Sequence, residues 1–103
     1  MIARIWRTGL DEGRAAEYDA FAAERSLPMF RRQPGIRAVF FARTATGRAV
    51  ITVWRDIAAA EALAESADYL ETVDAILATG FLRPPQSVEL LPVDDAWLAP
   101  DLI

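Results

Sequence analysis

The chain has 103 residues, of which 53% are hydrophobic, and its formal net charge is −4. It contains neither cysteine nor histidine, which excludes disulfides, thiolate metal sites and the usual general base of neutral pH. Its basic residues are all arginine and are not clustered, and no apolar stretch approaches the roughly 20 residues of a membrane span. We therefore expect a cytoplasmic protein that binds neither nucleic acid nor membranes.

A strand and an amphipathic helix are predicted first. Ile2–Arg7 is rich in β-branched and aromatic residues, and strand alternation places Arg4 and Trp6 on the same side. Asp11 is expected to cap a helix over residues 12–25, since its carboxylate can accept hydrogen bonds from the free amides of the first turn. One arc of this helix is apolar and is formed by Ala15, Tyr18, Phe21 and Ala22. The helix should therefore lie on a sheet.

A β-hairpin is predicted next. Pro28 is expected to bend the chain, and the strands Ile36–Arg43 and Ala49–Arg55 follow, joined by a turn over residues 44–47. Both strands are apolar on both sides. One side carries Ile36, Phe40, Ile51 and Val53, and the other carries Val39, Phe41, Val50 and Trp54.

A second helical region and a last strand complete the pattern. Asp56 is expected to cap a helix that runs to about Glu65, restarts at Ser66 and ends before Gly80. Its second part has an apolar stripe formed by Tyr69, Leu70, Val73, Ile76 and Leu77. The prolines at 84–85 are expected to prevent regular structure. A strand over Gln86–Val93 should then lie at a sheet edge, because it contains a proline near its end.

The order β-α-β-β-α-β predicts a ferredoxin-like α+β fold in one domain, residues 1–103, with a tail over residues 94–103. The antiparallel sheet should have the strand order 4-1-3-2 and both helices on one face. A sheet that is apolar on both faces must be covered on both. We therefore expect a homodimer through the sheet faces, and a monomer with a large pocket is the alternative. In the tail, Trp97, Leu98 and Ile103 are apolar, so we expect them to pack against another part of the protein.

Three segments resemble the antibiotic biosynthesis monooxygenase (ABM) domain family: the opening MIARIWR, LPMFRRQPGIRAVFFAR before and in the second strand, and ITVWRD at the end of the third. The resemblance covers essentially the whole chain. It implies a dimeric α/β barrel with helices outside and a ligand cleft between the sheet and the helices of each subunit. Some members oxygenate aromatic polyketides without a cofactor. The haem-degrading branch matches poorly, because its histidine ligand would fall near Val73 and the chain has no histidine.

The residues expected at such a cleft are aromatic and cationic. Arg4 beside Trp6 can hold a phenolate, enolate or carboxylate while an aromatic ring stacks alongside. The alternative is that Arg4 pairs with a carboxylate across the dimer. A tyrosine can orient a substrate oxygen or relay a proton, although an ordinary pKa of about 10 makes it a poor base. The predicted catalytic residues are Arg4 and Tyr69, and the predicted substrate-binding residues are Trp6, Tyr18, Phe21, Trp54 and Val73.

The resemblance together with these residues predicts a cofactor-independent monooxygenase of small aromatic or polyketide-type substrates. Such a reaction needs a dry apolar slot, a group that stabilises the substrate anion, and a proton acceptor. No dinucleotide, phosphate-loop, serine-hydrolase or zinc-protease motif is present, so neither a cofactor nor a metal is expected. The alternatives are a non-catalytic dimeric protein that binds a small apolar ligand or has a structural role, and an isomerase or cyclase.

Overall fold

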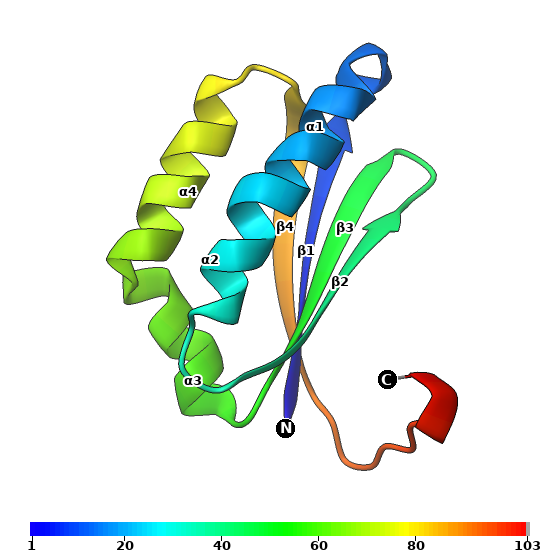
Figure 1. Cartoon of the computed structure of the whole chain (residues 1–103), viewed down its shortest axis with the longest axis vertical. Coiled ribbons are helices and arrows are strands. Elements are labelled where there is room, and N and C mark those ends of the chain that lie inside the picture. Colours follow the sequence, from blue (N-terminus) through cyan, green and yellow to red (C-terminus); the bar gives the residue numbers. More distant parts are fainter. Residues whose placement is uncertain (103) are drawn as a thin grey trace.

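Four strands form one antiparallel sheet in the order β2-β3-β1-β4, as the computed structural model of residues 1–102 shows (Figure 1). Their bounds are β1 (Ile2–Leu10), β2 (Ile36–Arg43), β3 (Gly47–Trp54) and β4 (Leu82–Pro92). This is the predicted order read from the opposite edge. The ferredoxin-like α+β fold expected from the sequence is therefore confirmed.

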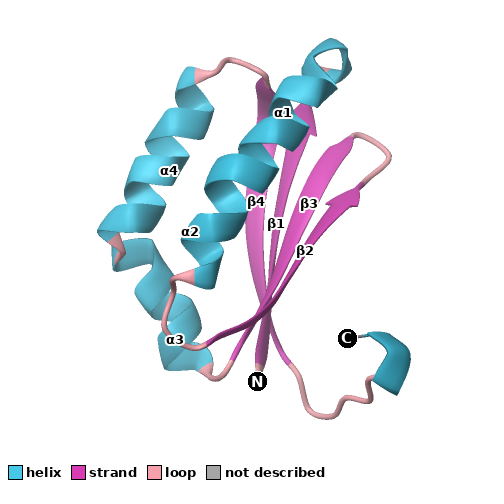
Figure 2. Cartoon of the chain, in the orientation of Figure 1, coloured by secondary structure: helices cyan, strands magenta, loops and turns pink. Residues whose placement is uncertain are grey.

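Two helical regions cover the same face of the sheet (Figure 2). The first consists of η1 (Glu12–Arg14), α1 (Ala15–Phe21), the π-helical turn η2 (Ala22–Ser26) and α2 (Leu27–Arg31). The second consists of α3 (Ile57–Ala62), η3 (Leu63–Glu65) and α4 (Ala67–Ala78), and η4 (Pro100–Leu102) lies in the tail. None of the helices within residues 1–102 is long and apolar enough to cross a lipid bilayer.

The predicted caps begin the helices where the sequence placed them. The Asp11 carboxylate accepts a hydrogen bond from the amide of Gly13, and the Asp56 carboxylate accepts one from Ala59 at 2.8 Å. Ser66 caps α4, since its Oγ accepts from the amide of Tyr69 at 3.3 Å.

Proline behaves differently from the sequence expectation at two places. Pro28 does not end the first helical region, because it occupies the first turn of α2, where its missing amide hydrogen and fixed φ are tolerated. Pro84 and Pro85 lie inside β4 rather than before it. They coincide with an irregularity in the pairing of β1 with β4, and β4 is an edge strand, so no neighbouring strand on its outer side requires their amides.

A register shift in β2 corrects a second expectation. The pairing of β2 with β3 is irregular between Ile36 and Ala38, and Ile36 packs against the helix-side core. The prediction that Ile36 shares a face with Phe40 was therefore wrong, because an irregularity in a strand reverses the alternation beyond it. The face of the sheet opposite the helices is here called the free face. It is formed by Ala3, Ile5, Arg7, Ala38, Phe40, Ala42, Ala49, Ile51, Val53, Ser87, Glu89 and Leu91.

The core between sheet and helices has two clusters. The larger comprises Ile2, Met29, Phe30, Val50, Trp54, Ala59, Ala60 and Leu63. The smaller comprises Leu10, Tyr18, Ile76 and Phe81. Residues from both clusters border the cavity described below, so the same packing that holds the helices on the sheet also shapes the site.

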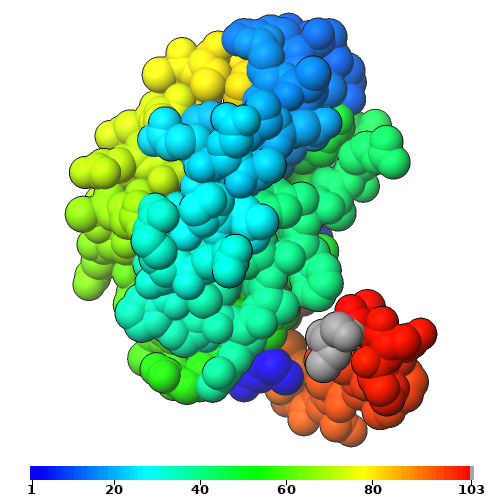
Figure 3. All heavy atoms as spheres, in the orientation of Figure 1, coloured from blue at the N-terminus to red at the C-terminus, as the bar shows by residue number. Residues whose placement is uncertain are grey.

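The C-terminal tail does not pack on the rest of this chain. From about residue 93 it projects from the body, in orange and red in Figure 3. Trp97 is 81% exposed, and Leu98 is also exposed. The expectation that these side chains are covered is not met within the single chain, and Ile103, the third residue of that expectation, lies outside the described residues.

Candidate functional site

A cavity of about 230 Å³ lies between the helix-covered face of the sheet and helices α1, α2 and α4. We call it the Arg4 cavity. Its walls are formed by Arg4, Trp6, Tyr18, Ser26, Met29, Phe30, Val50, Tyr69, Thr72, Val73, Ile76, Leu77, Leu82 and Gln86. Leu77 is 56% exposed although it lines the cavity, so the cavity opens to solvent beside α4. A mostly apolar concave site with a few polar groups is typical of small-molecule binding.

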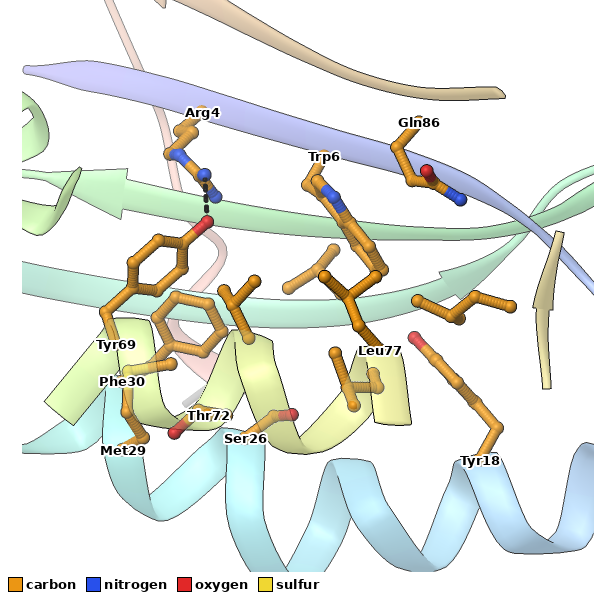
Figure 4. Close-up of a pocket in the computed structure, with 14 residues that line it drawn as sticks. Arg4, Trp6, Tyr18, Ser26, Met29, Phe30, Tyr69, Thr72, Leu77 and Gln86 are labelled. Carbon is orange, nitrogen blue, oxygen red and sulfur yellow. Dashed lines mark hydrogen bonds between the residues drawn. The ribbon is translucent and has the colours of Figure 1, made fainter. Parts of the chain in front are cut away.

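Strand alternation sets the floor of the cavity. In β1, Arg4 and Trp6 point to the helix side, and their partners in β3 are Thr52 and Val50. Trp6 lies in the middle of the cavity between two polar ends (Figure 4). Its indole offers an aromatic ring a stacking surface.

One polar end is a guanidinium with a tyrosine partner. Arg4 is only 7% exposed, and its Nη2 donates a hydrogen bond to the Tyr69 hydroxyl oxygen at 2.9 Å (Figure 4). Its Cζ lies 5.4 Å from the centroid of the Tyr69 ring. No carboxylate within residues 1–102 forms an ion pair with Arg4. The positive charge therefore faces the cavity without a negative partner from the described chain.

The other polar end holds Tyr18 and Gln86 (Figure 4). Gln86 Nε2 donates to Thr8 Oγ1 at 3.1 Å, which fixes the amide beside the sheet. Tyr18 is 3% exposed, and Arg48 lies over its ring with Cζ 5.7 Å from the centroid. Burial raises the pKa of Tyr18 to about 12, although the charge of Arg48 acts in the opposite direction. Tyr18 therefore remains a neutral hydrogen-bonding group at physiological pH.

The raised pKa of Tyr18 predicts a loss of stability in alkali. In the unfolded chain a tyrosine ionises near pH 10, whereas in the folded chain Tyr18 ionises near 12. Between these values the unfolded state binds fewer protons, so the free energy of unfolding falls as pH rises, by up to about 1.4 kcal/mol per pH unit. Urea unfolding of the wild type and of Tyr18→Phe at several pH values checks this. Parallel pH profiles for the two proteins would contradict it.

Five of the seven residues predicted for the site line the cavity together: Arg4, Trp6, Tyr18, Tyr69 and Val73. Phe21 and Trp54 do not line it. Phe21 packs edge-on against Phe81, with ring centroids 6.4 Å apart, and Trp54 is fully buried in the larger core cluster.

The alternative role predicted for Arg4 was an ion pair with a carboxylate across the dimer. Its side chain points to the helix side and into the cavity, away from the free face. A carboxylate of a second subunit packed on the free face would therefore lie on the opposite side of the sheet.

Several lining residues were not predicted from the sequence. Gln86 was assigned only to a strand, although the spacing 86, 88, 90 that shares one face of β4 would have pointed to it. Met29 and Phe30 follow Pro28, where the chain was expected to bend, so the sequence did not place them on a helix that faces the sheet. Within residues 1–102, no group of three acidic side chains is placed to hold a metal ion.

The fold is shared with several solved structures. SnoaB from Streptomyces nogalater, described as a cofactor-independent oxygenase, superposes with a TM-score of 0.75 at 21% identity, covering 92% of this chain and 94% of SnoaB. Rv0793 from Mycobacterium tuberculosis gives 0.71 at 22% identity, covering 93% and 98%. A protein described as an antibiotic biosynthesis monooxygenase gives 0.72 at 17% identity, covering 92% and 100%. The chain has the ABM fold.

The resemblance predicted from the three sequence segments is thus confirmed in three dimensions. Comparisons with protein-family profiles and with curated proteins give no significant match to this sequence. The ABM fold therefore rests on structural similarity over nearly the whole chain, and the activity has to be argued from the site.

Proposed function

We propose that the protein is a cofactor-independent oxygenase that acts on a small aromatic substrate in the Arg4 cavity. The observation that carries this proposal is the buried guanidinium of Arg4, which lies beside Trp6 in an apolar cavity and has no carboxylate partner within residues 1–102. The ABM fold adds support, since SnoaB is described as a cofactor-independent oxygenase.

The proposed reaction requires few groups from the protein. A substrate with an acidic CH₂ next to an aromatic ring loses a proton, and its anion forms a C–O bond with O₂. The distal peroxide oxygen then takes up the first proton. Loss of the second C–H proton breaks the O–O bond, and the hydroxide that leaves takes up this second proton to become water. One oxygen atom remains as a carbonyl, and the four electrons lost by carbon reduce O₂.

The chain's residues have distinct parts in this scheme. Arg4 stabilises the anionic oxygen of the substrate, where an unpaired cation in a dry site is most effective. Tyr69, held by Arg4, can donate its hydroxyl proton in a hydrogen bond to the same oxygen. Met29 and Phe30 are buried apolar side chains that line the cavity beside Arg4 and keep water from the reacting anion.

Oxygen consumption tests the proposal directly. Purified protein in air is expected to convert members of a dihydroxynaphthalene panel, whose keto tautomers carry an acidic CH₂, to quinones with one atom of ¹⁸O₂ in the product. Each compound is assayed up to the pH at which it ionises. Arg4→Met should lower kcat/KM by roughly 10²–10³-fold, the range seen when one oxyanion-stabilising group is removed. Trp97→Ala, far out on the tail, should leave the rate unchanged. Quinone formation no faster than in buffer across the panel would contradict the oxygenase.

A second candidate function is binding without turnover. The residues that line the Arg4 cavity include no aspartate or glutamate, and the sequence has no histidine. The site therefore lacks the side chains that usually accept a proton at neutral pH. Tight binding of aromatic compounds without oxygen consumption would favour this candidate over the oxygenase.

We also propose that two copies associate through their free faces. This face is mostly apolar, and it carries one ion pair, Arg7 Nη1 to Glu89 Oε1 at 3.1 Å, in which both side chains are about half exposed. Because the face contains both charges, a second copy related by a two-fold axis can offer each charge an opposite partner. Phe40 is 47% exposed and Leu91 is 40% exposed on this face, and a second copy would cover them.

A further inference from the structure

We infer that the Arg4 cavity captures its ligand as a preformed oxygen anion on a scaffold of one or two rings, so that the ligand, and not a protein base, supplies the ionisation. This inference rests on the proposed use of the same cavity and specifies the class of compound that enters it. The compounds concerned are acidic phenols, enols and related acids that are already ionised near neutral pH.

Arg4 is a buried cation with most of its hydrogen-bonding capacity unused within the described residues. A guanidinium has five N–H donors, and within residues 1–102 only one hydrogen bond from Arg4 is present, to Tyr69. Burial of a charge is unfavourable unless the charge is paired. Because Arg4 lines the cavity, an oxygen anion of a ligand bound there can accept hydrogen bonds from its remaining donors.

A second buried arginine provides the comparison. Arg48 is also 7% exposed, but its Nη1 contacts both carboxylate oxygens of Glu12, at 3.1 and 3.2 Å, and the carbonyl of Gly47. The fold thus neutralises one buried arginine with its own carboxylate. Arg4 has no such partner within the described residues, which distinguishes a receptor for an external anion from a structural ion pair.

The side chains that line the cavity with Arg4 include no carboxylate. From α4 the only titratable side chain that lines the cavity is Tyr69, and from α1 it is Tyr18 at the far end. From α2 the lining residues are Met29 and Phe30, and from β3 the residue paired with Arg4 is Thr52. None of these is a base at neutral pH.

Two carboxylates on the elements next to Arg4 form ion pairs away from the cavity. Asp68 of α4 forms two hydrogen bonds with Arg32, at 2.8 and 2.9 Å, on the exposed side. Glu89 of β4 pairs with Arg7 on the free face. Neither carboxylate is among the residues that line the cavity. A weakly acidic ligand would therefore find no side chain there to remove its proton, whereas an ionised ligand would find a cation.

The volume sets the size of the ring system. A cavity of roughly 150 Å³ holds one benzene molecule, and the Arg4 cavity of about 230 Å³ is about half as large again. One or two fused rings fit inside. Larger substituents would have to extend out of the cavity through the opening beside Leu77. At the far end, Tyr18 and Gln86 can hydrogen-bond a second oxygen of the ligand (Figure 4).

Binding measured as a function of pH tests the inference. The probes are 2-hydroxy-1,4-naphthoquinone, which is ionised at neutral pH, its 2-methoxy analogue, which cannot ionise, and 1-naphthol, which ionises only in alkali. Calorimetry should show the hydroxyquinone binding at least about tenfold more tightly than the methoxy compound at pH 7, since charge-assisted hydrogen bonds exceed neutral ones. Its affinity should fall at low pH with the midpoint of its own ionisation, and that of 1-naphthol should rise towards its own.

Variants separate Arg4 from the rest of the cavity. Arg4→Met should remove the preference for the anion and leave the weak affinity for the methoxy compound unchanged. Arg4→Lys should keep the preference at reduced affinity, because the charge stays while the planar fork is lost. Arg7→Met, on the same strand but on the free face, should bind like the wild type. If Arg4→Met does not fold, the pH series on the wild type still decides.

Two results would overturn the inference. One is equal affinity for the hydroxy and methoxy compounds, and the other is a single pH midpoint shared by all ligands, which would indicate a titrating protein group. Either result stands whether or not oxygen is consumed. Conversely, anion-selective binding of these probes together with no enzymatic quinone formation across the oxidisable panel would refute the proposed oxygenase and leave the inference intact.

Discussion

Trp54→Ala is expected to lower the free energy of unfolding by about 3–5 kcal/mol, the cost of removing a large aromatic side chain from a packed core. Trp54 has no exposed surface, and it packs in the cluster that joins β1 and β3 to α2 and α3. Its Nε1 donates to Thr52 Oγ1 at 2.8 Å, so the indole is also fixed by a buried hydrogen bond. A domain of this length has a total stability of only about 5–15 kcal/mol, so this loss is a large part of it.

Urea denaturation followed by far-ultraviolet circular dichroism measures this effect. Trp97→Ala is the matched control, because it removes the same side chain from a position that is 81% exposed, and it should change stability by less than about 0.5 kcal/mol. Thr52→Val isolates the hydrogen bond by leaving the indole N–H without its acceptor, at an expected cost of about 1–3 kcal/mol. If the Trp54→Ala variant were as stable as Trp97→Ala, Trp54 would not stabilise the larger core cluster, which would contradict the prediction.

The two strand tryptophans show what the sequence can and cannot predict. Alternation in β1 and β3 correctly places Trp6 and Trp54 on the same helix-covered face. It does not predict that one lines a cavity while the other is sealed. That difference depends on where α3 and η3 close over the sheet, since Ala59, Ala60 and Leu63 pack around Trp54. Helix placement of this kind is a tertiary property that no local pattern contains.

The contact between Arg4 and Tyr69 is a second feature that the sequence could not predict. The two residues are 65 positions apart, and each was a plausible candidate from its own element. Their contact requires the rotation of α4 about its axis, which is fixed by the Ser66 cap and by the packing of Ile76 in the smaller core cluster. The cap was predictable, and the resulting angle of the helix to the sheet was not.

Irregularities in the strand backbone account for the main errors in the fold predicted from the sequence. The shift in β2 moves Ile36 to the helix side, and the proline pair enters β4 where its pairing with β1 is disturbed. Such irregularities are set by how neighbouring strands align over their whole length. A pattern of period two detects the strand but not the point at which its register changes.

The apolar free face predicts that two copies of the chain associate. Wild-type protein at micromolar concentration is expected to sediment as a dimer, and Phe40→Asp is expected to weaken association by roughly a thousandfold. In a two-fold interface the substitution is present twice, so about 2 kcal/mol per copy, typical of a central aromatic contact, becomes about 4 kcal/mol in total. Phe40 is 47% exposed in the single chain and faces away from the helices, so the variant should remain folded.

Ile57→Asp is the control, because Ile57 is 45% exposed but lies at the start of α3 on the helix side. A new acidic residue in the first turn of a helix is also favourable to that helix. This variant should therefore dimerise like the wild type. A monomeric wild type, or equal weakening by both substitutions, would contradict association through the free face. The Arg4 cavity lies on the opposite side of the sheet, so anion binding should survive in a folded Phe40→Asp monomer, and the two proposals can fail independently.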